Sequence, residues 1–558
     1  MIRFVCFLLL LCSLVGGQAC RSSRKAAKSA PAKRPATAAS TPKKPAPASP
    51  APATPAPRPT EVVADAPLYT TPAPPKREFR AVWIATVDNI DWPSRKGLPS
   101  DVQQAEFRTM LDEYYQTGMN AVVVQVRAAA DAFYAKSPEP WSEWLTGQQG
   151  LAPNPFYDPL EFMIDEAHNR GMEFHAWLNL DRATFSKTAS VTPTNIAFQR
   201  PNWMVEYGGR KLFNLGMPEV RAYVAGVVAN LVRNYDIDGI HFDDYFYPYA
   251  VAGQTFSDDH TYRASGSILP KADWRRSNVD QLIRQLGDSI QAIKPYVKFG
   301  ISPFGIWKNR SSDPEGSATN GGQSYYELYA DSRKWAREGW IDYIAPQVYF
   351  STGFERVPYR VLVDWWTQNS GKRHLYIGHG AYRIGKGGAR DSAWQQPAQL
   401  PLQIRHNRQR TPVHGSIFFS AKSLRSNPYG VRDSLATNLY RYPALVPTMP
   451  WKDSLAPLAP HDLKAAAVED GIELFWQAPE PAADGDRAHY YVVYRFEGRN
   501  PDCRTDDPRH IVAICRGEST TRFVDRSTAK GKRYTYIVTA FDRLHNESEG
   551  ATLRHHGL

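Results

Sequence analysis

The chain has 558 residues, including 15 Trp, 29 Tyr and 44 Pro, and this length suggests three or four structural units rather than one compact domain. Its net charge of +11 would suit a nucleic-acid-binding protein, but ten of its Lys and Arg residues lie between residues 20 and 76, where only two acids oppose them. Because the rest of the chain is close to neutral, we expect no nucleic-acid partner.

Residues 1–19 are typical of a secretory signal peptide. Arg3 provides a positive start, and residues 4–15 form an apolar stretch that is too short to span a bilayer. Small residues precede Cys20, which resembles a bacterial lipobox whose cysteine is lipidated after cleavage. We therefore expect a lipid anchor at Cys20 in the bacterial cell envelope, with the protein facing the periplasm. Ordinary signal cleavage near Ala19 is the alternative.

Residues 20–76 are rich in Pro, Ala and Lys. Such a segment cannot bury enough apolar surface to fold, and proline favours extended conformations, so we expect a disordered tether. Its positive charge would suit an anionic envelope polymer or a membrane surface, although a merely solubilising role explains the composition equally well.

Residues 77–447 alternate between buried strand patterns and amphipathic helix patterns. One helix is expected to begin at a capping box, Ser100–Gln103, and to end at Gly118. Eight such units predict a (β/α)8 TIM barrel of the α/β class. A doubly wound open sheet is the rival, but no glycine-rich nucleotide loop supports it. The expected barrel strands cover 79–87, 120–126, 172–178, 239–243, 298–302, 341–348, 375–379 and 415–419.

Residues 455–553 show short alternating strands without long helical patterns, which predicts a small all-β sandwich. The run 534–542 resembles a late strand of a fibronectin type III domain, and Trp476 resembles the early core tryptophan of that family. Cys503 and Cys515 are the two cysteines of the mature body. In an exported domain we expect them to form a disulfide, with two free buried thiols as the alternative.

The segment 238–248 carries the strongest functional signal. A buried strand ends there in Asp243 and Asp244, and aromatic residues follow directly. Catalytic groups of parallel α/β proteins lie at the carboxyl ends of strands, and carboxylates beside aromatic rings are typical of sugar-cleaving sites. We therefore expect Asp243 and Asp244 to be catalytic residues of a glycoside hydrolase. The plain alternative is a capped strand end.

Polar residues also occur near the ends of other expected strands, where side chains at i and i+2 share one face. We expect Arg127 and His241 to lie close to Asp243 and to keep it ionised. Three histidines near strand ends, His175, His241 and His379, suggest a metal site. However, no His-x-His pair follows the first strand, so we expect neither a metal nor a cofactor. The expected substrate-binding residues are Arg127, Asp131, His175, Trp177, Asn179, His241, Tyr245, Trp307, Gln347 and Tyr349.

Several ordered motifs between residues 77 and 445 together resemble the family-10-like glycosyl hydrolase lipoproteins, which are distinct from the family 10 xylanases. This resemblance implies a (β/α)8 barrel, a lipid anchor and cleavage of peptidoglycan glycan strands stripped of their peptides. Without this resemblance, the residues predict only that the substrate is a polysaccharide. The alternative is a non-catalytic glycan-binding envelope lipoprotein that uses the barrel mouth as a lectin site. The motifs are 80–87, 89–94, 125–127, 131–134, 175–179, 238–248, 300–307 and 346–349.

The chain departs from this family pattern at two loops. Asn214-Leu215-Gly216 stands where Asp-Pro-Gly is usual, and Leu180-Asp181 stands where Pro-Tyr is usual. The run 238–243 also resembles α-amylase-like and α-galactosidase-like barrels, which implies that Asp243 is the nucleophile. The acid that those barrels carry on the fifth strand has no counterpart here. The general acid is therefore open among four residues, which are, in order of preference, Asp244, Asp131, Asp91 and Asp181.

Overall fold

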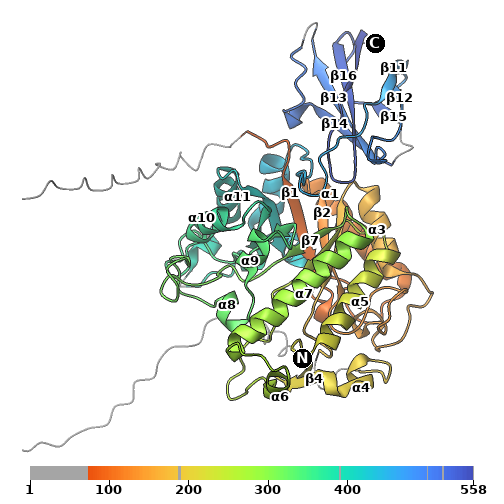
Figure 1. The fold of residues 1–558 in the computed structure, drawn as a ribbon. Helices are drawn as coiled ribbons and strands as arrows, with labels where there is room; N and C mark the ends of the chain where they lie inside the picture. The colour runs from red at the N-terminus through yellow and green to blue at the C-terminus, as the bar shows by residue number, and fades with distance from the viewer. Residues whose placement is uncertain (1–72, 186–189, 389–390, 499–500, 518–520, 557–558) are drawn as a thin grey trace, which may run out of the picture. The chain divides into compact units, whose positions relative to one another are not determined.

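The computed structural model of the protein describes residues 73–185, 190–388, 391–498, 501–517 and 521–556. These residues form a closed parallel barrel with helices around it, followed by small antiparallel sheets (Figure 1). The predicted signal peptide, most of the predicted tether and Cys20 lie outside the described residues. Within the described ranges, no helix has the length and apolar character needed to cross a membrane.

All eight predicted barrel strands are present in the described residues. They pair in parallel around a closed ring in the order β1-β10-β9-β8-β7-β6-β3-β2, which confirms the predicted TIM barrel. β8 is shorter than the predicted segment. The strands are β1 (Phe79–Ile84), β2 (Ala121–Arg127), β3 (Glu173–Leu178), β6 (Gly239–Phe242), β7 (Lys298–Ile301), β8 (Tyr343–Ile344), β9 (His374–Gly380) and β10 (Val413–Phe419).

Longer helices pack around the outside of the barrel (Figure 1). The first of them ends at Gly118 in the left-handed conformation, as predicted. The predicted capping box is wrong, because Pro99 occupies the N-cap position and the Ser100 hydroxyl donates to the Pro155 carbonyl at 2.6 Å. The longer helices are α1 (Ser100–Thr117), α3 (Pro159–Asn169), α5 (Pro218–Asn234), α7 (Lys271–Ile293), α10 (Tyr359–Asn369) and α11 (Gln399–Arg408).

Shorter elements occupy the connections between strands and helices, where loops of a barrel carry most of its functional variation. The hairpin of β4 (Met204–Tyr207) and β5 (Arg210–Phe213) lies in the connection after β3. The short helices are α2 (Glu143–Thr146), α4 (Ile196–Gln199), α6 (Asp259–Ala264), α8 (Ser324–Glu327), α9 (Ser332–Arg337), α12 (Ala421–Arg425) and α13 (Val431–Ser434).

The C-terminal residues form two antiparallel sheets. Trp476, Tyr491 and Val538 come from both sheets and share one buried cluster, so the sheets pack face to face and the sandwich prediction is confirmed. The likeness to fibronectin type III domains stays a prediction. One sheet contains β11 (His461–Val468), β12 (Gly471–Gln477) and β15 (Arg522–Asp525), and the other contains β14 (Ile511–Arg516), β13 (Tyr490–Glu497), β16 (Arg533–Phe541) and β17 (Ala551–His556).

Both cysteines of this sandwich are free thiols in the structure, so the predicted disulfide between Cys503 and Cys515 is wrong here. Cys515 packs against the cluster that contains Trp476, whereas Cys503 packs against a different cluster that contains Phe496. Burial raises the pKa of the Cys515 thiol to about 11. The alternative of two free thiols, both partly buried, is the one that the structure supports.

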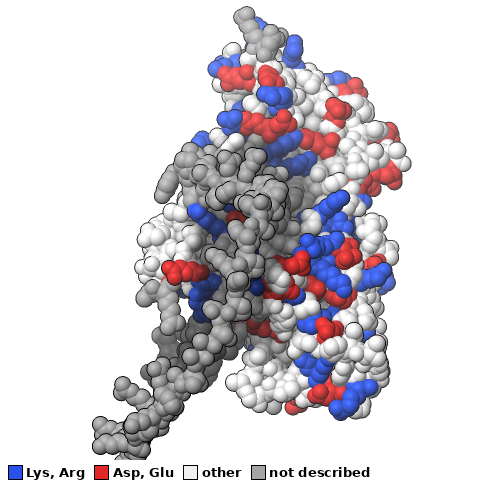
Figure 2. Space-filling view, turned by 60° about the vertical axis from the view of Figure 1, so that its left-hand side comes forward, with Lys and Arg blue, Asp and Glu red and all other residues white. Residues whose placement is uncertain are grey.

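Charged side chains of both signs are interspersed over the face of the described residues that Figure 2 shows. Some of them form ion pairs between separate segments, such as Glu113 with Arg425 at 2.9 Å and with Arg432 at 3.0 Å. Neither sign dominates this face, which agrees with the concentration of positive charge in residues 20–76.

Candidate active site

The barrel mouth is the ring of positions at the carboxyl ends of the barrel strands, and Asp243 directly follows β6 there. Its carboxylate accepts four hydrogen bonds. Trp177 Nε1 donates to Oδ2 at 3.1 Å, and Asn179 Nδ2 lies 3.2 and 3.3 Å from the two oxygens. The backbone N–H of Tyr245 donates to Oδ1 at 3.2 Å. These donors fix the orientation of the carboxylate.

Burial raises the pKa of Asp243, while the charge of Arg182 and the hydrogen bonds from Asn179, Tyr245 and Trp177 oppose that rise. The net effect is a raised pKa. The donors still favour the ionised form over a bare buried carboxylate, so the site can hold a negative charge away from water.

Asp244, the next residue, is also almost fully buried. Gln347 Nε2 donates to its Oδ1 at 2.7 Å, and the Tyr249 hydroxyl donates to its Oδ2. Burial and the charge of Asp243 together raise the pKa of Asp244 to about 6. Two neighbouring buried carboxylates do not ionise with equal ease, so the pair can hold one charge and exchange a proton near neutral pH.

Arg182 is a member of this site that we did not predict. It lies in the connection after β3, where its backbone N–H donates to Asn179 Oδ1 at 3.0 Å. Its guanidinium carbon lies 4.1 Å from the centre of the Tyr245 ring. Its charge is the largest of the influences that lower the pKa of Asp243. The only sequence signal for this residue was its position three residues after Asn179.

Five of the predicted substrate-binding residues surround the acid pair. Trp177, Asn179 and the backbone of Tyr245 contact Asp243, and Gln347 contacts Asp244. Tyr349 stacks on Phe419 with ring centres 6.0 Å apart, and burial raises its pKa, with a smaller contribution from the charge of Asp244.

Arg127 and His241 do not act on Asp243 as predicted. Arg127 forms a buried two-armed ion pair with Glu139, at 2.6 Å for each contact, and donates to the Asn179 carbonyl. Its charge is therefore neutralised locally. Burial lowers the pKa of His241 well below its usual value, so this ring is neutral. His241 bonds to Tyr343 and Ser302 in the barrel core, so it orders the core instead of supplying charge.

The remaining predicted residues have structural partners. His175 bonds to Glu173 at 3.0 Å and to the Tyr343 hydroxyl at 2.8 Å. The neighbouring Gly239 is required at this level of the core, because a Cβ there would lie 2.6 Å from His175 Nδ1. His379 bonds to Gln403 and Ser416.

Two candidate acids and one candidate aromatic residue likewise bond to structural groups of the barrel. Asp131 accepts from the Ser142 hydroxyl at 2.8 Å and from a backbone N–H. Asp91 accepts from the Ser420 hydroxyl and from two backbone N–H groups. Trp307 donates to Asp331 at 2.8 Å and stacks on Trp365. None of these three is bonded to the acid pair.

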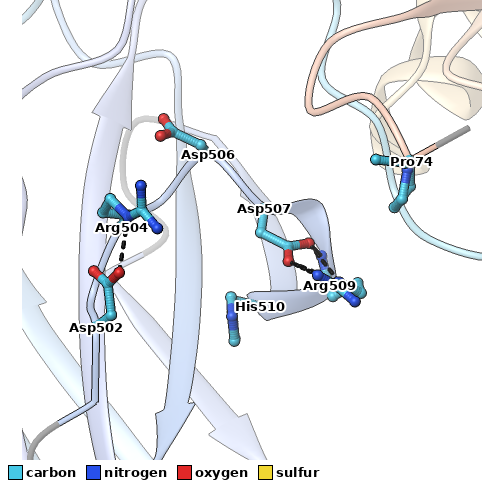
Figure 3. Close-up of a pocket in the computed structure, with 8 residues that line it drawn as sticks. Pro74, Asp502, Arg504, Asp506, Asp507, Arg509 and His510 are labelled. Atoms are coloured by element: carbon cyan, nitrogen blue, oxygen red, sulfur yellow. Dashed lines mark hydrogen bonds and ion pairs between the residues drawn. The ribbon is translucent and has the colours of Figure 1, made fainter.

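A cavity of about 380 Å³ is lined by Ala73, Pro74 and residues of the loop 502–510 in the C-terminal module (Figure 3). Arg504 pairs there with Asp502 at 2.8 Å, and Arg509 pairs with Asp507. Each of these arginines is therefore already paired with an acid close in sequence. A second cavity, of about 310 Å³, is lined by residues that include Arg284, Trp340, Arg373 and Trp451. Neither cavity contains the acid pair.

Comparison with known proteins adds to this geometry. Residues 78–396 match the family described as Glycosyl hydrolase-like 10. The chain is 46% identical over 483 residues to Glycosyl hydrolase YngK of Bacillus subtilis (strain 168). The aligned region covers 85% of this chain and 92% of that protein. It is 38% identical over 364 residues to Glycosyl hydrolase DigH of Escherichia coli (strain K12). This aligned region covers 61% of this chain and 82% of that protein. A similar solved structure is the PgaB (BpsB) glycoside hydrolase domain from Bordetella bronchiseptica, with a TM-score of 0.43, 15% identity, and coverage of 64% of this chain and 99% of that one.

Proposed function

Because this chain belongs to the Glycosyl hydrolase-like 10 family, we propose that it is a glycoside hydrolase of the bacterial cell envelope that cleaves peptidoglycan glycan strands stripped of their peptides. Membership of this family confirms the predicted family and the predicted enzyme class. It also sets aside the alternative of a lectin without catalytic activity. The peptidoglycan substrate and the envelope location are the proposed parts.

The observation that carries the catalytic assignment is the carboxylate of Asp243, held by donors on both oxygens at the end of β6. Glycoside hydrolysis passes through a positively charged, oxocarbenium-like transition state, and two carboxyl groups usually support it. A buried, oriented negative charge stabilises that state more strongly than a solvated one, because nothing has to reorganise during the reaction. Asp243 therefore faces the anomeric carbon, either bonding to it or acting through a water.

Asp244 supplies the second carboxylate of the pair. Gln347 and Tyr249 hold its two oxygens, and a pKa of about 6 lets it exchange protons in the physiological range. We assign it the proton that the attacking water must lose. Tyr245 and Tyr349 place aromatic rings beside the pair, and such rings pack against the apolar faces of sugars.

The substrate proposal rests on three further observations. The motifs of the barrel resemble lipoproteins implicated in cutting peptide-free peptidoglycan. The first 19 residues are typical of a secretory signal, which would deliver the enzyme to the compartment that holds peptidoglycan. The positive segment that follows would favour an anionic envelope surface.

The test is a comparison of substrates with the purified wild-type enzyme. Peptidoglycan freed of its peptides by an amidase, intact peptidoglycan and chitin oligosaccharides are each digested, and the released fragments are identified by mass spectrometry. We expect soluble disaccharide-based fragments from the peptide-free strands and much less from intact peptidoglycan. Cleavage of chitin oligosaccharides alone would contradict the substrate while leaving the family activity in place.

A further inference from the structure

Asp181 is placed beside the acid pair by contacts on both sides of it. Two residues earlier, Asn179 bonds to the carboxylate of Asp243. One residue later, Arg182 lies over the ring of Tyr245, which directly follows the acid pair in sequence. The carbonyl of Asp181 itself accepts from the Phe213 N–H at 2.7 Å, which ties this connection to β5. These contacts hold the Asp181 backbone beside the acid pair, and the charges of Asp243 and Asp244 act on its carboxyl group.

Asp181 is 3% exposed, and its Oδ1 is buried without a hydrogen-bond partner among the described residues. Both oxygens of Asp243 and of Asp244 accept hydrogen bonds, as described above. A buried carboxyl oxygen without a donor favours the protonated form of its group. The adjacent Arg182 Nε is also buried without a hydrogen-bond partner in the described part of the chain. One donor and one acceptor at the mouth are thus left for a group that enters from outside.

The surrounding charges agree with this assignment. Burial raises the pKa of Asp181 to about 7, and the charges of Asp243 and Asp244 add to the rise. Arg182 and Arg210 oppose it. Below neutral pH the proton therefore stays on Asp181 while a neighbouring carboxylate is ionised, which is the division of roles that a glycosidase needs.

We propose that Asp181 is the general acid of this site, an assignment that rests on the proposed glycosidase function. As the bond between the anomeric carbon and the glycosidic oxygen breaks, its electron pair stays on that oxygen, which takes the proton from Asp181 and leaves as a hydroxyl group. Water adds its oxygen to the anomeric carbon, and Asp244 accepts the proton that this water loses. Exchange with solvent then returns a proton to Asp181 and removes the one on Asp244, so one water is consumed for each bond cut.

This role rests on the chain's own residues and not on the family pattern. Leu180-Asp181 stands where the resembled family usually has Pro-Tyr, so the assignment does not describe the family. The rival candidates have other commitments, because Asp131 and Asp91 accept bonds from scaffold groups, and Asp244 is held by Gln347 and Tyr249.

The experiment compares Asp181→Asn with wild type on two kinds of substrate. One is peptide-free peptidoglycan, whose leaving sugar must be protonated, and the other is a nitrophenyl glycoside of the same disaccharide, whose leaving group needs no proton. We expect kcat on the glycan to fall by about 10²–10⁴-fold, the usual contribution of a general acid, and kcat on the nitrophenyl glycoside to change by only a few fold. The alkaline limb of the wild-type pH profile should disappear in the variant. Equal losses on both substrates, or a rise in KM alone, would overturn the assignment.

A measurement without substrate provides a second readout. The infrared difference spectrum between wild type and Asp181→Asn at pH 5 should contain the carbonyl band of a protonated carboxyl group, and this band should disappear as the pH rises past about 7. Absence of the band would overturn the proposal. Asp433→Asn, at an exposed acid on the outer helix α13, is the matched control and should change neither readout. If Asp243→Asn keeps full activity while Asp181→Asn behaves as expected, the assignment of Asp243 is the part that fails.

Discussion

Trp177 on β3 donates a hydrogen bond from its indole nitrogen to Asp243 Oδ2, 3.1 Å away at the end of the neighbouring strand β6. Trp177 is 7% exposed, so this bond is shielded from water. A side chain that would otherwise serve as barrel packing thus orients the carboxylate that we place at the centre of the reaction. The strand register of β3 and β6 sets this contact, and it couples the stability of the barrel to the geometry of the site.

Trp177→Phe keeps an aromatic ring and removes the donor. A hydrogen bond to a charged group contributes about 1.5–3 kcal/mol, so we expect kcat/KM to fall by roughly 10–100-fold. Loss of a donor to the ionised form raises the pKa of Asp243, so the acidic limb of the pH–rate profile should move to higher pH. An unchanged profile with normal activity would show that the bond does not matter to the reaction.

Arg182→Gln removes the cation that most lowers the pKa of Asp243 and of Asp181. Both pKa values should rise, so both limbs of the pH–rate profile should move to higher pH. Arg432→Gln removes a cation that pairs with Glu113 away from the mouth, and it serves as the control with an unchanged profile. A shift of equal size in both variants would contradict a local electrostatic role for Arg182.

The raised pKa of Asp181 also predicts how stability depends on pH. An acid whose pKa is about 3.9 in the unfolded chain and about 7 in the folded protein stabilises the fold fully below pH 4, and this contribution is lost as the pH rises through 7. Asp181→Asn avoids burying that charge, so its free energy of unfolding should exceed the wild-type value at pH 8 by a few kcal/mol, and by much less at pH 5. Urea denaturation at the two pH values measures this, and a variant less stable than wild type at pH 8 would contradict a buried carboxyl group with a raised pKa.

Cys20→Ser tests the proposed anchor. A lipidated cysteine would hold the protein in the membrane fraction, and serine cannot take its place in the lipid attachment. We expect the wild-type protein to sediment with membranes and the variant to be released into the soluble fraction, as judged by fractionation and immunoblotting. A Cys20→Ser protein that stays with the membranes would rule out anchoring through this residue.

The barrel was predictable because buried parallel strands are continuous apolar runs separated by helix-length spacers, and all eight recur at the expected positions. The acid pair was predictable because its position after β6 follows from that strand. The hydrogen-bond or ion-pair partner of each polar residue was not predictable from the sequence. The alternation of side chains along a strand gives the face on which Arg127 lies. It does not predict that Glu139, twelve residues later, forms an ion pair with Arg127. Asp181 and Arg182 lie in a connection whose path depends on the β4–β5 hairpin, which no local pattern specifies.

The most direct test of the account is the activity of Asp243→Asn on peptide-free peptidoglycan. This change removes the charge, nearly preserves the shape and leaves one oxygen to accept the bonds from Trp177 and Asn179. Loss of a catalytic carboxylate costs several kcal/mol of transition-state stabilisation, so we predict a loss of about a thousandfold or more in fragment release, with the melting temperature and glycan binding retained. A folded Asp243→Asn enzyme that releases fragments at near the wild-type rate would contradict the central claim.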